Sequence, residues 1–193
     1  MFRFTQHDNR VRSAFLFPKG GAVSLGRRSL GEGGSRPSVM SPEIEELYQD
    51  VILDHSRRPR NFGELPDAAV LVHGDNPACG DEIHLAVKFD AEGGLEDIKF
   101  NGRGCAISQA SASLMTMKLK GKSRTEVMEM LQAFHDLVTA DTSEAPKTLG
   151  DLRVMQGVRK FPQRVKCAML AWRAVQQAYE QGTGEATIST EPT

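Results

Sequence analysis

Apolar residues recur at helical spacing in several stretches of the chain. They predict helices over residues 41–55, 105–117, 123–138 and 162–181, and a short helical segment over residues 149–158. The first helix begins with Ser41, Pro42 and Glu43, which are preferred residues for a helix cap and first turn. The last begins at Pro162 and should end at Gly182. Its buried face is predicted to consist of Val165, Met169, Trp172, Val175 and Tyr179.

Between the first two predicted helices the pattern changes to alternation. Residues 68–73 predict a first strand, and a second is predicted by apolar residues at every other position, which are Ile83, Leu85, Val87 and Phe89. A glycine turn at residues 92–94 follows, and Ile98 and Phe100 mark the inward face of a third strand. Because short connections join these strands, we expect them to form an antiparallel meander.

The loop between the first two strands carries a thiol and a carboxylate. Residues 74–81 are rich in Gly, Asp, Asn and Pro, which form turns, so Cys79 and Asp81 should project from an exposed connection. Gly80 allows the backbone to fold tightly enough for the sulfur and a carboxylate oxygen to converge. Two donors that converge on one point indicate a metal site.

The two ends of the chain differ from the part between them. Residues 1–39 are rich in arginine, glycine and serine and show no periodicity, which predicts a disordered basic leader. Two explanations stay open for it: an organellar transit segment, or an extension from a misassigned start with Met40 as the initiator. Residues 40–182 are predicted to form one domain, and residues 183–193 a disordered tail.

Composition restricts the class of protein further. The chain has 193 residues, of which 39% are hydrophobic, enough for one ordinary globular domain. Its net charge of -1 argues against a nucleic-acid binder, which needs a basic excess. The sequence has no apolar run near the length of about 18 residues that predicts a membrane span. Three widely spaced cysteines are a poor disulfide framework, so the thiols fit a reducing cytoplasm.

Three thiols and one carboxylate form the candidate site. Cys105 lies at the predicted start of a helix, where the helix dipole favours a thiolate, and Cys167 lies early in the last helix. Together with Cys79 and Asp81 they supply a tetrahedral set of three sulfurs and one oxygen, which suits Zn²⁺. The alternative from the spacing is three unrelated buried cysteines. His84 could replace Asp81 as a ligand, but we expect it to be an ordinary surface histidine.

Four motifs carry a resemblance to a known family. They are Asn61-Phe62-Gly63, Asn76-Pro77-Ala78-Cys79-Gly80-Asp81, Gly102-x-Gly104-Cys105-Ala106-Ile107-Ser108-x-Ala110-Ser111-Ala112-Ser113, and Phe161-Pro162-x-Arg164-x-Lys166-Cys167. With these motifs, the chain from Ser41 to about Gly182 resembles the iron-sulfur cluster assembly family of IscU and the NifU N-terminal domain. It is most similar to the SufU branch of that family, with all three cysteines in register.

The resemblance implies an α+β fold, in which a small three-stranded antiparallel sheet packs against several helices in a single domain. It also implies that Cys79, Asp81, Cys105 and Cys167 are the metal ligands. Two departures from the IscU pattern are similar to SufU: Lys166 stands where a histidine normally precedes the third cysteine, and the segment between the second and third cysteines is longer. A lysine therefore replaces a potential cluster ligand.

What the resemblance implies for function is a zinc-dependent sulfurtransferase. It would accept persulfide sulfur from a cysteine desulfurase of the SufS type and pass it to downstream iron-sulfur assembly proteins. Cys79 is the expected sulfur acceptor, because it lies in a glycine-flanked loop whereas Cys105 and Cys167 are fixed on helices. Two alternatives stay open: a scaffold that assembles a [2Fe-2S] cluster on the same ligands, and a zinc-stabilised adaptor that activates the desulfurase without chemistry of its own.

Overall fold

The computed structural model describes residues 42–140 and 145–190, with side chains from residue 49 onward in the first helix. Its helices and strands, in chain order, are α1 (Pro42–Arg57), β1 (Val70–Asn76), β2 (Asp81–Phe89), β3 (Leu95–Arg103), α2 (Ala106–Leu119), α3 (Arg124–Thr139), the 3-10 segment η1 (Lys147–Lys160), α4 (Pro162–Gln181) and β4 (Gly184–Ser189). The predicted helices and the three predicted strands are all present, with boundaries that differ by a few residues. The predictions for residues 1–39 and for the last three residues lie outside the described part.

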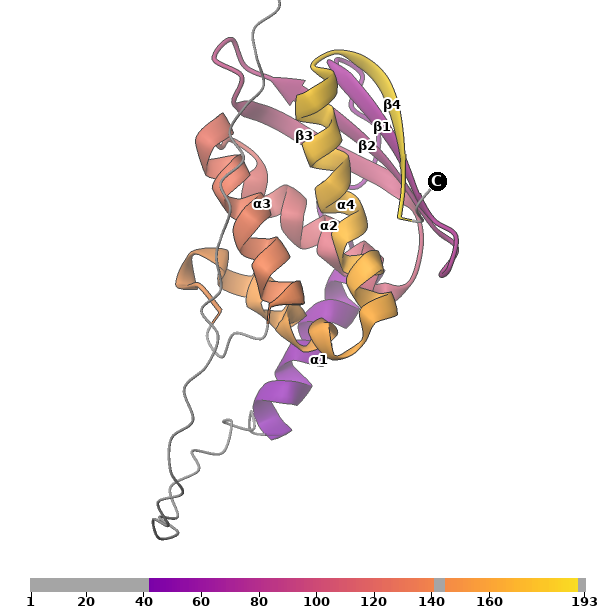
Figure 1. Cartoon of the computed structure of the whole chain (residues 1–193), viewed down its shortest axis with the longest axis vertical. Coiled ribbons are helices and arrows are strands. Elements are labelled where there is room, and N and C mark those ends of the chain that lie inside the picture. The colour runs from indigo at the N-terminus through magenta and orange to yellow at the C-terminus, as the bar shows by residue number, and fades with distance from the viewer. Residues whose placement is uncertain (1–41, 141–144, 191–193) are drawn as a thin grey trace, which may run out of the picture. The chain divides into compact units, whose positions relative to one another are not determined.

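One sheet has the strand order β3-β2-β1-β4 (Figure 1). β1 and β2 pair antiparallel, as do β2 and β3, whereas β4 runs parallel to β1. The α+β class is confirmed, but the predicted number of strands is wrong, because the sheet has four strands and not three. The prediction that residues 183–193 are a disordered tail is also wrong for β4, which is an ordered strand within that range. Only Ala186 and Ile188 of β4 are partly buried apolar residues, too few to show alternation, and its pairing partner is far away in the sequence.

Helices α2 and α4 cover one face of the sheet (Figure 1). Small residues along α2, buried between the sheet and α4, let the two helices approach closely. In that contact Ser111 Oγ donates to the Ala168 carbonyl at 2.7 Å and accepts from Trp172 Nε1 at 3.1 Å. Trp172 is fully buried and stacks on Phe134 of α3, with ring centroids 4.1 Å apart. α4 is therefore anchored to both neighbouring helices by a single aromatic residue.

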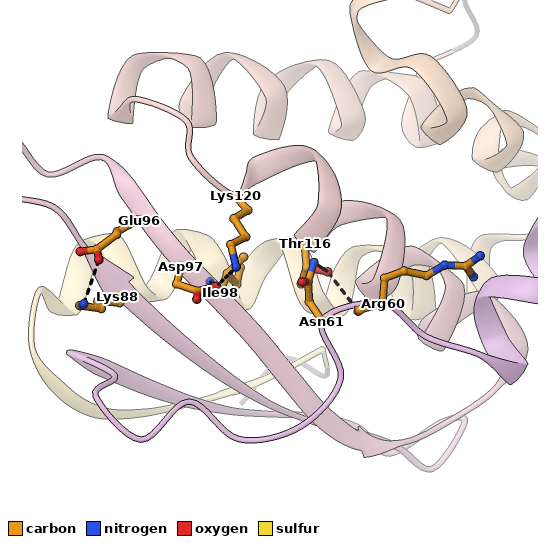
Figure 2. Close-up of polar contacts among 8 residues, drawn as sticks. All are labelled: Arg60, Asn61, Lys88, Glu96, Asp97, Ile98, Thr116 and Lys120. Atoms are coloured by element: carbon orange, nitrogen blue, oxygen red, sulfur yellow. Dashed lines mark hydrogen bonds and ion pairs between the residues drawn. The ribbon is translucent and has the colours of Figure 1, made fainter.

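Polar contacts hold the segment after α1 and the end of α2 in place (Figure 2). Asn61 Nδ2 donates to Thr116 Oγ1 of α2 at 3.1 Å, and Lys120 pairs with Asp97 of β3 at 2.7 Å. The basic segment at residues 57–60 is tied back as well, since Arg60 pairs with Asp54 at 2.6 Å. These contacts fix the loop after α1 to α2, and the end of α2 to β3.

The start of α3 carries a capping box formed by Ser123 and Glu126. Ser123 accepts a hydrogen bond from the Glu126 backbone, and the Glu126 side chain accepts one from the Ser123 backbone at 3.0 Å. Hydrogen bonds from Lys122 and Ser123 lower the pKa of Glu126 to about 2. Among the described helices, none combines the length and apolar character needed to cross a membrane.

Candidate metal centre

The turn between β1 and β2 supplies the first two donors. Asn76 and Asp81 face each other in the strand register, and the Cys79 backbone N–H closes the turn on the Asn76 carbonyl at 3.1 Å. Gly80 adopts a φ of 66°, a left-handed conformation that favours glycine, so the tight turn predicted around it is present. Cys79 is half-buried, but Asp81 is only 1% exposed. The prediction that Asp81 projects into solvent is wrong, because it is the first inward-facing residue of β2.

Cys167 completes a compact group with these two residues. The donor atoms of Cys79, Asp81 and Cys167 all lie within 4.8 Å of one another. Cys167 lies in the second turn of α4 and is 1% exposed, although the sequence places it off the buried face. The buried face is wider than one stripe because α4 contacts the sheet on one side and α2, α3 and η1 on others. Cys167 therefore approaches the turn from the protein interior.

Cys105 reaches the group from the N-terminus of α2. It is the N-cap residue, and its backbone N–H donates to Asp81 Oδ1 at 2.7 Å. Its Sγ lies 3.9 Å from the other carboxylate oxygen, Oδ2. Gly104 makes this approach possible, since a Cβ there would lie 2.8 Å from Asp81 Oδ1. All four residues predicted as ligands thus meet around the Asp81 carboxylate, with Cys79, Asp81 and Cys167 as the mutually close set.

Asn76 is a residue of this site that the sequence analysis did not single out. Its side chain is fully buried, and its Nδ2 lies 3.3 Å from both Asp81 Oδ2 and Cys167 Sγ. Its Oδ1 accepts a hydrogen bond from Thr190 Oγ1, just after β4, at 2.9 Å. Its place before Pro77 says only that a turn begins there, and its place in the Asn76–Asp81 motif does not say what its side chain contacts.

The electrostatics of the site favour a cation. Burial raises the pKa of the Cys167 thiol well above its ordinary value, and hydrogen bonds to Asp81 and Cys79 raise it further. Arg164 lies in the first turn of α4 with Nη1 3.8 Å from Cys79 Sγ. Hydrogen bonding to Cys167 and electrostatic attraction to the Cys105, Cys79 and Cys167 sulfurs raise the pKa of this arginine. Several potential anions thus share a small volume, and a divalent cation would balance their charge.

The donor set fits zinc in chemistry and in size. Three thiolates and one carboxylate form a four-ligand set for Zn²⁺, in which donors lie roughly 3.8 Å apart for zinc–sulfur bonds of about 2.3 Å. The observed limit of 4.8 Å requires only a small contraction of the mutually close residues. His84 does not belong to the set: it is exposed on the other face of β2, with its Nδ1 2.6 Å from His73 Nδ1.

Comparison with known proteins gives a consistent picture. The family model described as "NifU-like N terminal domain" matches residues 47–168. The chain is 43% identical to "Zinc-dependent sulfurtransferase SufU" of Bacillus subtilis (strain 168), over 73% of this chain and 95% of the relative. It is 45% identical to "Iron-sulfur cluster assembly scaffold protein IscU" of Streptococcus pyogenes serotype M1, over 72% of this chain and 86% of the relative.

A solved structure supports the same assignment of the fold. The crystal structure of a putative iron-sulfur cluster assembly scaffold protein for the SUF system from Fervidobacterium islandicum AW-1 is similar, with a TM-score of 0.63 and 33% identity. The similarity covers 70% of this chain and 98% of that one. The region around the four donors therefore lies on a fold shared with proteins named for iron-sulfur assembly.

Proposed function

The chain belongs to the family of NifU-like N-terminal domains, and on this premise we propose that it is a zinc-dependent sulfurtransferase that accepts persulfide sulfur from a cysteine desulfurase. Cys79, Asp81, Cys105 and Cys167 are the proposed zinc ligands. Bound zinc would keep the thiols deprotonated at neutral pH, whereas a free thiol with a pKa near 8.5 is only a few per cent thiolate. The reducing cytoplasm is the compartment that fits this chemistry.

The observation that supports this function best is the contrast between Cys79 and the two buried donors, Asp81 and Cys167; Cys105 is also half-buried but is held at the N-cap of α2. Cys79 is half-buried between exposed Ala78 and Gly80 in a turn, while Asp81 and Cys167 are each 1% exposed. A persulfide on a partner protein can reach a donor in such a turn far more readily than one inside the core. Cys79 is therefore the proposed sulfur acceptor.

The proposed transfer is a thiol exchange in which no net oxidation occurs. The Cys79 thiolate attacks the outer sulfur of the desulfurase persulfide. A new S–S bond forms at Cys79, the S–S bond to the desulfurase cysteine breaks, and that cysteine leaves as a thiolate. The proton remains on the transferred sulfur. Arg164, 3.8 Å from Cys79 Sγ, would stabilise the anionic sulfur during the approach.

A scaffold for a [2Fe-2S] cluster is the second candidate, supported by the name of the Streptococcus pyogenes relative and by thiolates that also suit iron-sulfur clusters. Lys166 argues for the sulfurtransferase, because a lysine cannot serve as the additional imidazole ligand expected at that position in the IscU pattern. Metal analysis after anaerobic purification separates the two: zinc supports the sulfurtransferase, and iron with inorganic sulfide supports the scaffold.

The decisive experiment combines the protein with a purified SufS-type desulfurase. We expect the wild-type protein to stimulate cysteine turnover and to carry a persulfide on Cys79 in mass spectrometry. Cys79→Ala should abolish the stimulation while circular dichroism shows a folded domain, and His135→Ala, a change at an exposed histidine, should behave as wild type. Full stimulation by Cys79→Ala would contradict the assignment. Stimulation by wild type without any persulfide would indicate a docking adaptor instead.

A further inference from the structure

The C-terminal strand β4 completes the sheet next to the metal centre. It pairs with β1 from Val70↔Gly184 to Asp75↔Ser189, and the Thr190 N–H adds one more hydrogen bond to the Asp75 carbonyl at 3.0 Å. The segment lies beyond residue 168, where the match to the family model ends. Its last contacts are made beside the residue that opens the Cys79 turn.

Thr190 holds the Oδ1 end of the buried Asn76 amide in place. A side-chain amide has one oxygen that accepts and one NH₂ that donates, and the two ends can exchange by a flip. The Thr190 hydroxyl, only 6% exposed, donates to Asn76 Oδ1 at 2.9 Å. This contact leaves Nδ2 facing Asp81 and Cys167, each at 3.3 Å. The flipped amide would bring its oxygen against a carboxylate and a sulfur, which is repulsive.

We propose that the C-terminal strand is part of the metal centre: Thr190 orients Asn76, and Asn76 holds Asp81 and Cys167 in the positions needed to bind metal. Both are positioning residues, since neither supplies a donor to the ion in this arrangement. The proposal rests on the metal site of the proposed function. Residues that orient ligands in this way typically change metal affinity about 10- to 100-fold when they are replaced.

The test measures zinc affinity by competition with a chelator of known affinity, and the visible spectrum of the cobalt-substituted protein. Thr190→Val keeps the shape but removes the hydroxyl, so we expect zinc binding about tenfold weaker and a shifted cobalt spectrum. Thr190→Ser should restore both. Ser189→Ala is the matched control: its hydroxyl donates to the Asp75 side chain at 3.0 Å, outside the donor set.

The outcomes separate this proposal from the proposed function. If Thr190→Val leaves the zinc affinity and the cobalt spectrum unchanged, the role of β4 is overturned but the proposed function is not. The same holds if Ser189→Ala loses as much zinc affinity as Thr190→Val. A wild-type protein that binds neither zinc nor cobalt overturns the proposed function as well. Should Thr190→Val fail to fold, the same measurements on Thr190→Ala decide, with its thermal unfolding recorded to confirm a folded state.

A separate observation lies on the opposite face of the same two strands. His73 and His84 are directly opposite in the β1–β2 register, both are exposed, and their Nδ1 atoms are 2.6 Å apart. The pair borders a cavity of about 380 Å³, whose lining also includes the oxygen-bearing side chains of Glu64 and Asn101. Two ring nitrogens this close can both face a single cation.

We propose that His73 and His84 form a second site, for a divalent late transition-metal ion, with the cavity open to further oxygen or water ligands. Imidazole nitrogen is a preferred donor for nickel, copper and zinc. For metal–nitrogen bonds of about 2.0 Å at right angles, two donors lie roughly 2.8 Å apart. The observed nitrogen separation of 2.6 Å is close to that value, so a small rotation of either ring admits the ion.

Calorimetric titration of the zinc-loaded protein with Ni²⁺ at neutral pH tests this site, with released zinc monitored in parallel. We expect one Ni²⁺ per chain without zinc release, at least tenfold weaker binding in His73→Ala and in His84→Ala, and no change in His135→Ala, which removes an exposed histidine of α3. The proposal would be overturned if the wild-type protein did not bind Ni²⁺, or if His73→Ala and His84→Ala bound it as tightly as wild type. An equal loss of Ni²⁺ affinity in His135→Ala would also overturn it.

Discussion

The two cysteines that meet across the metal centre come from regions built in opposite ways. Cys79 lies in a short turn with exposed neighbours, held by one backbone hydrogen bond. Cys167 is 1% exposed and lies on a helix that contacts the sheet and other helices. One site thus combines a donor on an exposed turn with a donor fixed in the core. The proposed function needs both: the fixed donors retain the metal while the turn presents its sulfur to a partner.

The largest expected effect on stability concerns α4, the helix that carries the donor fixed in the core. Trp172 is fully buried and joins α4 to α2 and α3, so Trp172→Ala should lower the free energy of unfolding by about 3–5 kcal/mol. Urea denaturation followed by circular dichroism measures the loss. Because α4 carries Cys167, zinc affinity should fall as well. A loss below about 1 kcal/mol would contradict the view that α4 is the fixed side.

Metal removal should come next in size. A ligand present at 100 times its dissociation constant stabilises the folded state by about 2.7 kcal/mol, so chelation of zinc should lower the free energy of unfolding by roughly that amount. In Cys167→Ser we expect this difference to vanish, because a fixed donor is lost. In Cys79→Ser part of it should remain. Equal effects of the two serine variants would remove the distinction between the two sides.

A smaller effect is expected in the turn. Gly80 has a φ of 66°, and a methyl group added there would meet no other atom closely, so Gly80→Ala costs only the backbone conformation, about 1 kcal/mol. Gly157→Ala in η1, where space is also open and φ is not left-handed, is the control and should be nearly neutral. Thermal unfolding of both variants with and without zinc checks this. A larger loss with zinc than without it would show that metal binding uses the native turn.

The smallest effect is a pH dependence far from the metal. The pKa of Glu126 is about 2 in the folded protein, below its ordinary value of 4.5. A carboxyl group with a lowered pKa stabilises the folded state above pH 4.5 and loses this contribution as pH falls toward 2. The stability difference between wild type and Glu126→Gln should therefore shrink over that range. A difference independent of pH would contradict the capping interaction.

Much of the fold could be predicted because its signals are local. The cap at Ser123, the proline that begins α4 and the glycine that ends it are readable from neighbouring residues, and they define these helices as the structure has them. β4 could not be predicted, because it depends on pairing with β1 rather than on its own composition. A strand of two inward apolar residues has no local signal strong enough to be distinguished from a tail.

The site divides in the same way. Residue types and motifs were enough to nominate the four donors, and the structure brings them to one carboxylate. Burial was not predictable from them: turn-forming residues around Asp81 suggested exposure, and the apolar stripe of α4 left out Cys167, although both are 1% exposed. The role of Asn76 depends on contacts with residues 91 and 114 positions away, which no local pattern encodes.

The contact between Asn76 and Thr190 also bears on the order in which the protein is made. The two residues are 114 positions apart, so at typical rates of synthesis of about 5–20 residues per second, Thr190 is added roughly 6–23 seconds after Asn76. During that interval the Cys79 turn can form while its orienting partner does not yet exist. With the proposed role of Thr190, the ligand geometry is completed only after residue 190 has been made, which would delay tight metal capture until then.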